Sequence, residues 1–317
     1  MYPHEDMCLY AIYRNQGVAG MEACVEQAAA MGLERICFVE PSQGRSQGWL
    51  DRFGAECRRL DDGHDIDVYS AIEARIIDGS GKLDAPAQLP DHIDLLFARA
   101  YELPFGQACL SMAEAKFEIA TGFVSASMFL AETTRAYLNV LHKHPGVILN
   151  RPFDLLEHVG LSSADVPGAV VRLLARTAKK NHAMLCIHEG PRQPATSVLR
   201  SFDEANVPLL FGTGAIDTAQ LGTYKQIHQV LMRLRRNVTT ALIPVGPGEG
   251  LPLMIPPRAD RGSLPEPVSS PAQPSYALFS QPLAQARPMI PSSNPDVPRM
   301  PLSILRPPVK RQYRQLH

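Results

Sequence analysis

Short apolar runs alternate with longer amphipathic stretches over the first 236 residues. The short runs, bounded by Gly, Pro, Asn or Asp, have the length and composition of β-strands. They predict strands at residues 8–13, 34–39, 68–77, 93–98, 147–149, 184–187 and 207–211. The amphipathic stretches have apolar residues at helical spacing. They predict helices at 21–31, 49–60, 113–142 with a break near Thr121-Gly122, 166–180, 196–205 and 223–236.

This order of elements limits the fold. Strands that alternate with helices pair in parallel through right-handed crossovers, because each helix carries the chain back to the same end of the sheet. Such a series indicates an α/β fold, either a barrel or a doubly wound sheet.

The composition changes sharply near residue 244. The last 74 residues hold 17 of the 28 prolines and carry a net charge of +4, which leaves −5 for the rest of the chain. Proline lacks an N–H group and fixes φ, so it is excluded from helix interiors and central strands. We therefore expect a folded domain at 1–243 and a basic, mostly disordered Pro-rich tail at 244–317 with extended polyproline-like segments.

Composition excludes several classes of protein. The chain is 45% hydrophobic and 20% charged with a net charge of −1, which is ordinary for a globular protein and does not favour nucleic-acid binding. The six cysteines show no CxxC spacing, so neither a zinc ribbon nor a disulfide scaffold is indicated. No signal peptide or membrane span is expected. We expect reduced thiols and a cytoplasmic protein.

One carboxylate lies inside a predicted strand. Glu73 is flanked by apolar residues in the run 68–77. A buried carboxylate is costly unless a positive group pairs with it. Glu73 therefore contacts a metal or a basic group, or else this end of the strand faces solvent. The sequence leaves these alternatives open.

Residues 5 to about 236 resemble the polymerase-and-histidinol-phosphatase (PHP) family. The resemblance lies in VEQAAAMGLERICFVEP, in SAIEARIIDGSGKLDAPAQLP with DLLFARAYELP, and in VPLLFGTGAID. It implies a distorted (β/α)7 barrel of the PHP type. Active members of that family hold a cluster of metal ions at the carboxyl ends of the strands and hydrolyse phosphate esters.

The metal-binding positions of this family are mostly replaced here. Glu73 stands where the family has a glutamate on its third strand. No histidine lies between Glu5 and His64, so the His-x-His pair of the first strand is missing. The other positions are filled by Tyr10, Glu40, Tyr101, Arg151, Cys186 with His188, and Gly214-Ala215-Ile216.

Several carboxylates and imidazoles are needed to hold a cluster of divalent ions. The replacements therefore indicate a pseudoenzyme without metal cofactors, in which Arg151 pairs with Glu73. Such a protein is expected to bind a protein partner through the barrel surface and the Pro-rich tail. Some replicative polymerases resemble this, keeping a degenerate PHP domain as a binding platform.

Two other functions stay open. The first is a divergent phosphoesterase that holds Mn, Fe or Zn through Glu73, His188, Asp217 and Glu40. The second, which the net charge disfavours, is nucleic-acid binding through the basic tail. Two further segments are interpreted as structural. His4-Glu5-Asp6 is expected to belong to a disordered N-terminus, and the apolar face of the basic helix Lys225–Arg236 is expected to pack on the barrel.

Overall fold

The computed structural model describes residues 4–86, 89–190 and 193–234. The boundary at 243 and the tail at 244–317 lie outside this part of the chain. The described strands are β1 (Glu5–Tyr10), β2 (Arg35–Pro41), β3 (Asp67–Arg75), β4 (Leu95–Arg99), β5 (Leu103–Phe105), β6 (Ala108–Leu110), β7 (Ile148–Asn150), β8 (Met184–His188) and β9 (Leu209–Gly212). The helices are α1 (Ile12–Ala30), α2 (Gln47–Gly63), α3 (Met112–Ala120), α4 (Ala126–Lys143), α5 (Gly168–Lys180), α6 (Thr196–Glu204) and α7 (Lys225–Leu234), with 3₁₀ turns η1 (Leu156–Val159), η2 (Ser163–Asp165) and η3 (Thr218–Gln220).

Seven parallel strands form one sheet in the order β1-β2-β3-β4-β7-β8-β9. The two outer strands approach each other and nearly close the sheet into a barrel. Leu9 and Ala215 form a parallel bridge, the Tyr10 N–H donates to the Ala215 carbonyl at 2.7 Å, and the Gly214 N–H donates to the Cys8 carbonyl at 2.9 Å. The predicted α/β barrel is therefore confirmed.

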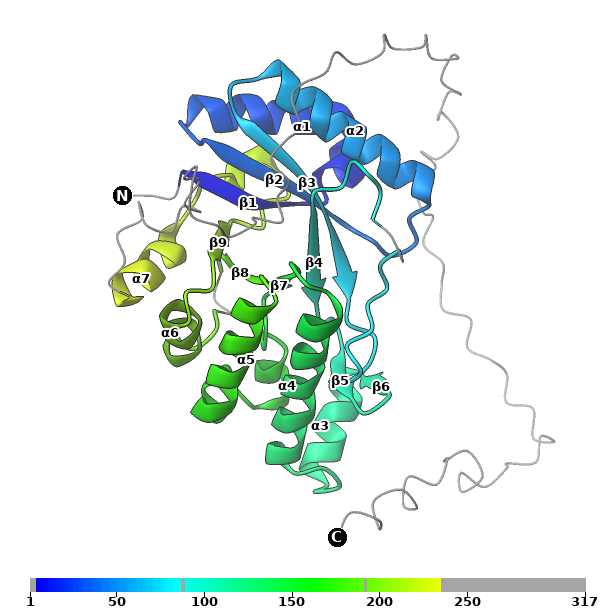
Figure 1. Cartoon of the computed structure of the whole chain (residues 1–317), viewed down its shortest axis with the longest axis vertical. Helices are drawn as coiled ribbons and strands as arrows, with labels where there is room; N and C mark the ends of the chain where they lie inside the picture. The colour runs from blue at the N-terminus through cyan, green and yellow to red at the C-terminus, as the bar shows by residue number, and fades with distance from the viewer. Residues whose placement is uncertain (1–3, 87–88, 191–192, 235–317) are drawn as a thin grey trace, which may run out of the picture. The chain divides into compact units, whose positions relative to one another are not determined.

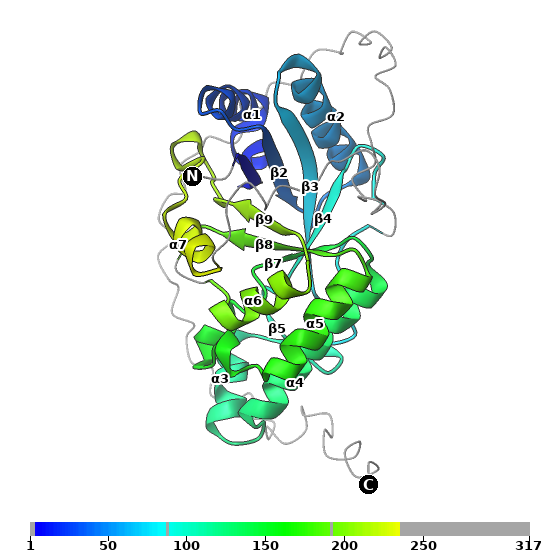
Figure 2. The same ribbon diagram turned by 60° about the vertical axis from the view of Figure 1, so that its left-hand side comes forward.

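Helices surround the strands (Figures 1 and 2), with α1 and α2 beside β1–β3 and α4 to α6 beside the later strands. The side chains alternate along each strand, so that one set packs against helices and the other fills the interior. Phe38 of β2, for example, packs with Phe53 of α2 in the outer layer, whereas Cys37 and Val39 belong to the interior cluster. All seven strands finish at the same end of the barrel, which we call the carboxyl end.

Most predicted elements are present, with shifted ends. The predicted break near Thr121-Gly122 separates α3 from α4, and Gly122 has φ 72° at this turn. The prediction was wrong for the segment after β1, where α1 begins at Ile12 and contains a kink at Gly17 instead of starting at residue 21. The β5–β6 hairpin was not predicted.

The expectation of a disordered N-terminus was wrong for Glu5 and Asp6, which belong to β1 and are buried. The Asp6 carboxylate accepts hydrogen bonds from the Thr213 N–H at 2.9 Å, the Thr213 hydroxyl at 2.6 Å and the Gly222 N–H at 3.3 Å. These bonds join the first strand to the loops that follow the last strand. Asp6 thus helps to close the barrel.

The interpretation of α7 as a packed helix is confirmed for the described residues. Ile227, Val230 and Leu231 are buried and belong to the cluster that includes Phe202 and Phe211. Across the described ranges, no helix is both long enough and apolar enough to span a membrane.

Candidate functional site

A layer of polar side chains lies on the interior core at the carboxyl end of the barrel. Each of these side chains lies two positions after an interior residue of its own strand, so it also points into the barrel. The interior cluster contains Cys8, Ala71, Phe97, Ile148 and Cys186. The polar layer is formed by the residues two positions later, namely Tyr10, Glu73, Arg99, Asn150 and His188.

Glu73 is at the centre of one hydrogen-bond network. It is 1% exposed, and its two carboxylate oxygens accept hydrogen bonds from the Tyr101 hydroxyl and from the Asn150 side-chain amide. The Tyr101 hydroxyl lies 2.7 Å from that of Tyr10. Both oxygens of the Glu73 carboxylate are therefore engaged by neutral protein groups.

Arg99 adds positive charge beside this network. One terminal nitrogen of its guanidinium donates to Asp154 at 3.1 Å, and the guanidinium carbon lies 4.8 Å from the centre of the Tyr101 ring. Burial raises the pKa of Tyr101, and the nearby Glu73 carboxylate raises it further. Burial, followed by the same carboxylate, raises the pKa of Tyr10 to about 12. Both phenols therefore stay protonated near neutral pH.

Arg151 and His188 form a second pair. A terminal guanidinium nitrogen of Arg151 lies 3.0 Å from Nδ1 of His188. The predicted Glu73–Arg151 ion pair is not formed, because Tyr101 and Asn150 take the carboxylate. Asn150, not Arg151, has the strand position that faces Glu73. Burial lowers the pKa of His188 well below its ordinary value, and the charges of Arg151 and then Arg99 lower it further.

The other predicted ligands lie apart from Glu73. Glu40 is next to the interior residue Val39 on β2, so its side chain points to the opposite, outer face of the strand. There it accepts a hydrogen bond from the Arg14 N–H at 3.1 Å. Burial raises its pKa to about 7. Asp217 caps η3 by accepting from the Ala219 N–H at 3.1 Å. The structure therefore does not assemble Glu73, His188, Asp217 and Glu40 into one site.

Cys186 lies in the interior core directly below this polar layer. Burial raises its pKa well above the ordinary value, although Arg151 opposes this. The thiol is therefore protonated and enclosed, which does not suit a nucleophile.

The polar layer does not fit a cluster of divalent ions. Its only carboxylate is occupied by two donors, and guanidinium groups lie beside it, whereas such ions need several anionic or imidazole ligands. Within the described ranges, no group of three or more His, Cys, Asp or Glu side chains is placed to hold a metal ion.

Sequence analysis missed Arg99, Asp154 and Asn150 as parts of this site. A signal was available for two of them, because Arg99 and Asn150 directly follow the predicted apolar runs 93–98 and 147–149, and polar residues at the ends of barrel strands indicate a site. Asp154 gave no such signal, since it lies in an irregular segment after β7.

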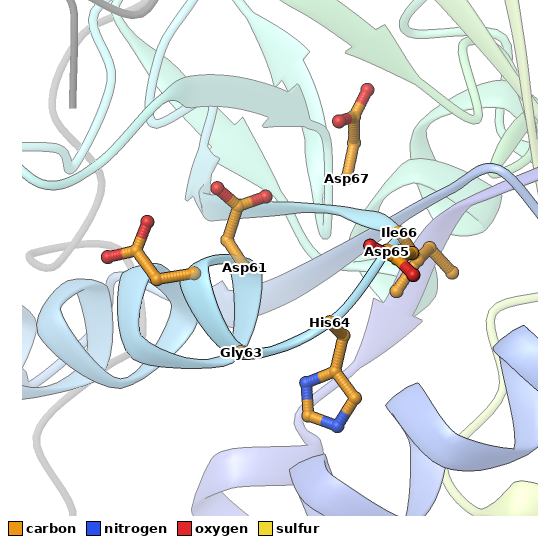
Figure 3. A pocket seen from close by; sticks show the side chains of 7 residues that line it. Asp61, Gly63, His64, Asp65, Ile66 and Asp67 are labelled. Atoms are coloured by element: carbon orange, nitrogen blue, oxygen red, sulfur yellow. The ribbon is translucent and has the colours of Figure 1, made fainter.

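A pocket lies at the opposite end of the barrel, where α2 leads into β3 (Figure 3). It has a volume of about 580 Å³ and is lined by residues 61–67. Asp61 accepts from the Val68 N–H at 2.8 Å, and Nδ1 of His64 lies 2.9 Å from the Leu60 carbonyl. Because local backbone groups engage these polar side chains, we interpret the pocket as part of a helix-to-strand turn.

No protein-family model and no curated protein sequence matches the chain. Among solved structures, it is similar to a protein described as a histidinol phosphatase from Listeria monocytogenes, with 12% identity over 71% of this chain and 99% of that one and a TM-score of 0.48. It is also similar to a chain in the cryo-EM structure of archaeal ribonuclease P with mature tRNA, with 13% identity over 69% and 81% and a TM-score of 0.42. Both likenesses have TM-scores below 0.5, so the fold assignment rests on the strand order described above.

Proposed function

We propose that this chain is a non-catalytic barrel protein of the PHP type that acts as an interaction or scaffolding subunit. The observation that carries the proposal is the occupation of Glu73 by Tyr101 and Asn150. The one inward-facing carboxylate that the family resemblance would assign to metal binding serves a hydrogen-bond network of the protein itself. The Pro-rich segment 244–317 is proposed as a second contact site.

Three exposed apolar side chains on either side of one turn support a role in protein contacts. Phe117, Phe123 and Met128 are 53%, 63% and 45% exposed and come from the end of α3, the following turn and the start of α4. Exposed large apolar side chains are candidates for contact with a partner when they form a contiguous surface.

Two measurements on the purified full-length protein test the absence of catalysis. Bound Mn, Fe and Zn are quantified by elemental analysis, and hydrolysis of p-nitrophenyl phosphate is measured with each metal added. We expect substoichiometric metal and no turnover above that of the metal alone. Stoichiometric metal together with turnover that is lost in Glu73→Gln would replace this proposal by a divergent metal-dependent phosphoesterase.

The interaction role is tested by affinity capture from the source cells. Full-length protein is compared with the 1–243 fragment and with Phe123→Ser, after circular dichroism has shown that each variant is folded. Leu173→Ser is the matched control, because Leu173 is also exposed, at 46%, but lies on α5. We expect a defined partner that is retained by Leu173→Ser and reduced by the tail deletion or by Phe123→Ser. Capture that no variant alters would contradict the assigned contact sites.

A further inference from the structure

The contact between Arg151 and His188 fixes which ring nitrogen of His188 carries the proton. Arginine can only donate hydrogen bonds, so Nδ1 of His188 must accept from it, 3.0 Å away. The proton of the neutral imidazole then lies on Nε2. The two neighbouring guanidinium groups and the burial of the ring keep His188 neutral.

Each member of the pair has a further N–H group without an acceptor. Nε2 of His188 and Nε of Arg151 are both buried, and neither has a hydrogen-bond partner among the described residues. The His188 residue is 6% exposed. Buried donors without acceptors are rare in folded proteins and carry a large desolvation penalty. Two of them on one contacting pair point to an acceptor that the chain itself does not supply.

The charge of Arg151 is also unbalanced. Arg99 has Asp154 and Arg75 has Asp84, whereas no ion pair within the described ranges includes Arg151. The Glu73 carboxylate is already engaged by Tyr101 and Asn150. One positive charge at the carboxyl end of β7 therefore remains available to an anion.

The backbone around the pair has an uncommon conformation. Arg151 has φ 48°, which few non-glycine residues adopt, and Gly214 has φ 67°. A Cβ atom at position 214 would lie 2.8 Å from a terminal nitrogen of Arg151 and 3.1 Å from Nδ1 of His188. Backbone strain of this kind is found at ligand sites, where surrounding structure maintains it.

We propose that Arg151 and His188 bind a carboxylate at the carboxyl ends of β7 and β8. A carboxylate has one negative charge, which matches that of the Arg151 guanidinium, and its two oxygens can accept from both donors. A phosphate dianion suits the site less well, because His188 adds no charge and the Glu73 carboxylate belongs to the same polar layer. The ligand is a free organic acid or, if the proposed interaction role holds, an acidic side chain of the partner.

The test uses the full-length protein and ¹⁵N NMR of the histidine side chains. Sodium acetate, sodium phosphate and two capped peptides, Ac-Gly-Glu-Gly-NH₂ and its Gln counterpart, are titrated at constant ionic strength. We expect acetate to shift the Nε2 signal of His188 saturably. If the Glu peptide binds more tightly than acetate and the Gln peptide has no effect, the natural ligand is a protein carboxylate. If acetate binds more tightly than the Glu peptide, the natural ligand is a free organic acid.

Variants separate this site from general attraction to positive charge. Arg151→Gln is expected to weaken acetate binding roughly tenfold or more, because a charge-assisted hydrogen bond is lost. His188→Gln, whose amide can replace the Nε2 donor, is expected to weaken it less than His188→Leu; because both variants lack the imidazole, their binding is followed by the ¹⁵N signal of Arg151 Nε. Arg14→Gln is the matched control, since Arg14 is an exposed arginine that follows β1 at the same end of the barrel.

The proposal is overturned if acetate gives no saturable shift, if phosphate binds more tightly than acetate, or if Arg14→Gln weakens binding as much as Arg151→Gln. None of these results depends on metal content or turnover. A failure here is therefore distinguishable from a failure of the proposed non-catalytic function.

Discussion

Gly214 lies directly against Arg151, so that any side chain at position 214 would contact the guanidinium. A Cβ there would be 2.8 Å from a terminal nitrogen, and the backbone φ of 67° is itself unfavourable for other residues. The loop after β9 therefore sets the position of a side chain that follows β7. This relationship can be tested by a single added methyl group.

Gly214→Ala is expected to destabilise the protein and to displace Arg151 from His188. The left-handed backbone alone costs roughly 1–2 kcal/mol for a non-glycine residue. Gly44→Ala is the matched control, because Gly44 has φ 71° and a Cβ atom added there would have no other atom within 4 Å. The loss of unfolding free energy in Gly44→Ala measures the backbone cost alone, and any larger loss in Gly214→Ala measures the added contact with Arg151. The His188 ¹⁵N signals should change only in Gly214→Ala. Equal spectra in the two variants would contradict the contact.

Asn150→Asp is expected to make stability fall more steeply with rising pH than it does in the wild-type protein. The new carboxylate would face Glu73, which now accepts a hydrogen bond from the Asn150 amide. Two adjacent carboxylates raise the pKa of one of them in the folded state. The variant should therefore approach wild-type stability at mildly acidic pH and lose stability as the pH rises. Urea midpoints at pH 5 and pH 7.5 check this, with Asn150→Ala showing a similar loss of roughly 1–3 kcal/mol at both values.

The wild-type protein is expected to be more stable at mildly acidic than at alkaline pH. Burial raises the pKa of Glu5 from 4.5 to about 7, that of Asp6 from 3.8 to about 6 and that of Glu40 from 4.5 to about 7. A folded-state pKa above the unfolded value gives stability that is present below the unfolded pKa and is lost as the pH rises through the folded pKa. The urea concentration at the unfolding midpoint should therefore decrease as the pH is raised from about 4.5 to about 7.

Glu5→Gln isolates one part of this pH dependence. Both carboxylate oxygens of Glu5 are buried without a hydrogen-bond partner among the described residues. The neutral amide should flatten the pH profile of the urea midpoint and raise stability above pH 7. Glu26→Gln, at an exposed position of α1, serves as the control and should leave the profile unchanged. A profile unaltered by Glu5→Gln would contradict the assigned role.

Asp6→Ala is expected to open the junction between β1 and β9. It removes the acceptor for the Thr213 hydroxyl and for two N–H groups, of Thr213 and Gly222. Leaving such donors unsatisfied costs about 1–3 kcal/mol each, although neighbouring groups can recover part of the loss. Amide hydrogen exchange should show faster exchange in β1 and β9 than in β2 and β3, with Asp62→Ala, on the exposed side of α2, as the control. Uniform loss of protection would argue against a local role.

The fold could be predicted from the sequence because each strand and helix is indicated by residues within its own segment. Runs such as 184–187 are bounded by turn residues and filled with apolar side chains, and the structure places β8 there. The start of β1 was misread for the opposite reason. Glu5-Asp6 looks like a solvated terminus, and only the contact with Thr213, 207 residues away, explains how Asp6 is buried.

The candidate site could be predicted only in part. The position of Glu73 on an inward strand face follows from the alternation of side chains along the run. Its partner did not follow, because Asn150 and Arg151 are neighbours at the end of β7 and a shift of one residue exchanges the side chain that faces inward. The left-handed φ of Arg151, which places it beside His188, has no local sequence signal.

The hydrogen bonds from Thr213 to Asp6 have a consequence for how the chain is made. During synthesis the first strand leaves the ribosome long before residues 213 and 222 exist, so its buried carboxylate has no donors for most of that time. Contacts this distant in sequence form late in folding. A nascent chain that stalls before residue 209, where β9 begins, would therefore leave the edges of β1 and β8 unpaired, and unpaired strand edges are the kind of surface from which chaperones protect a folding chain.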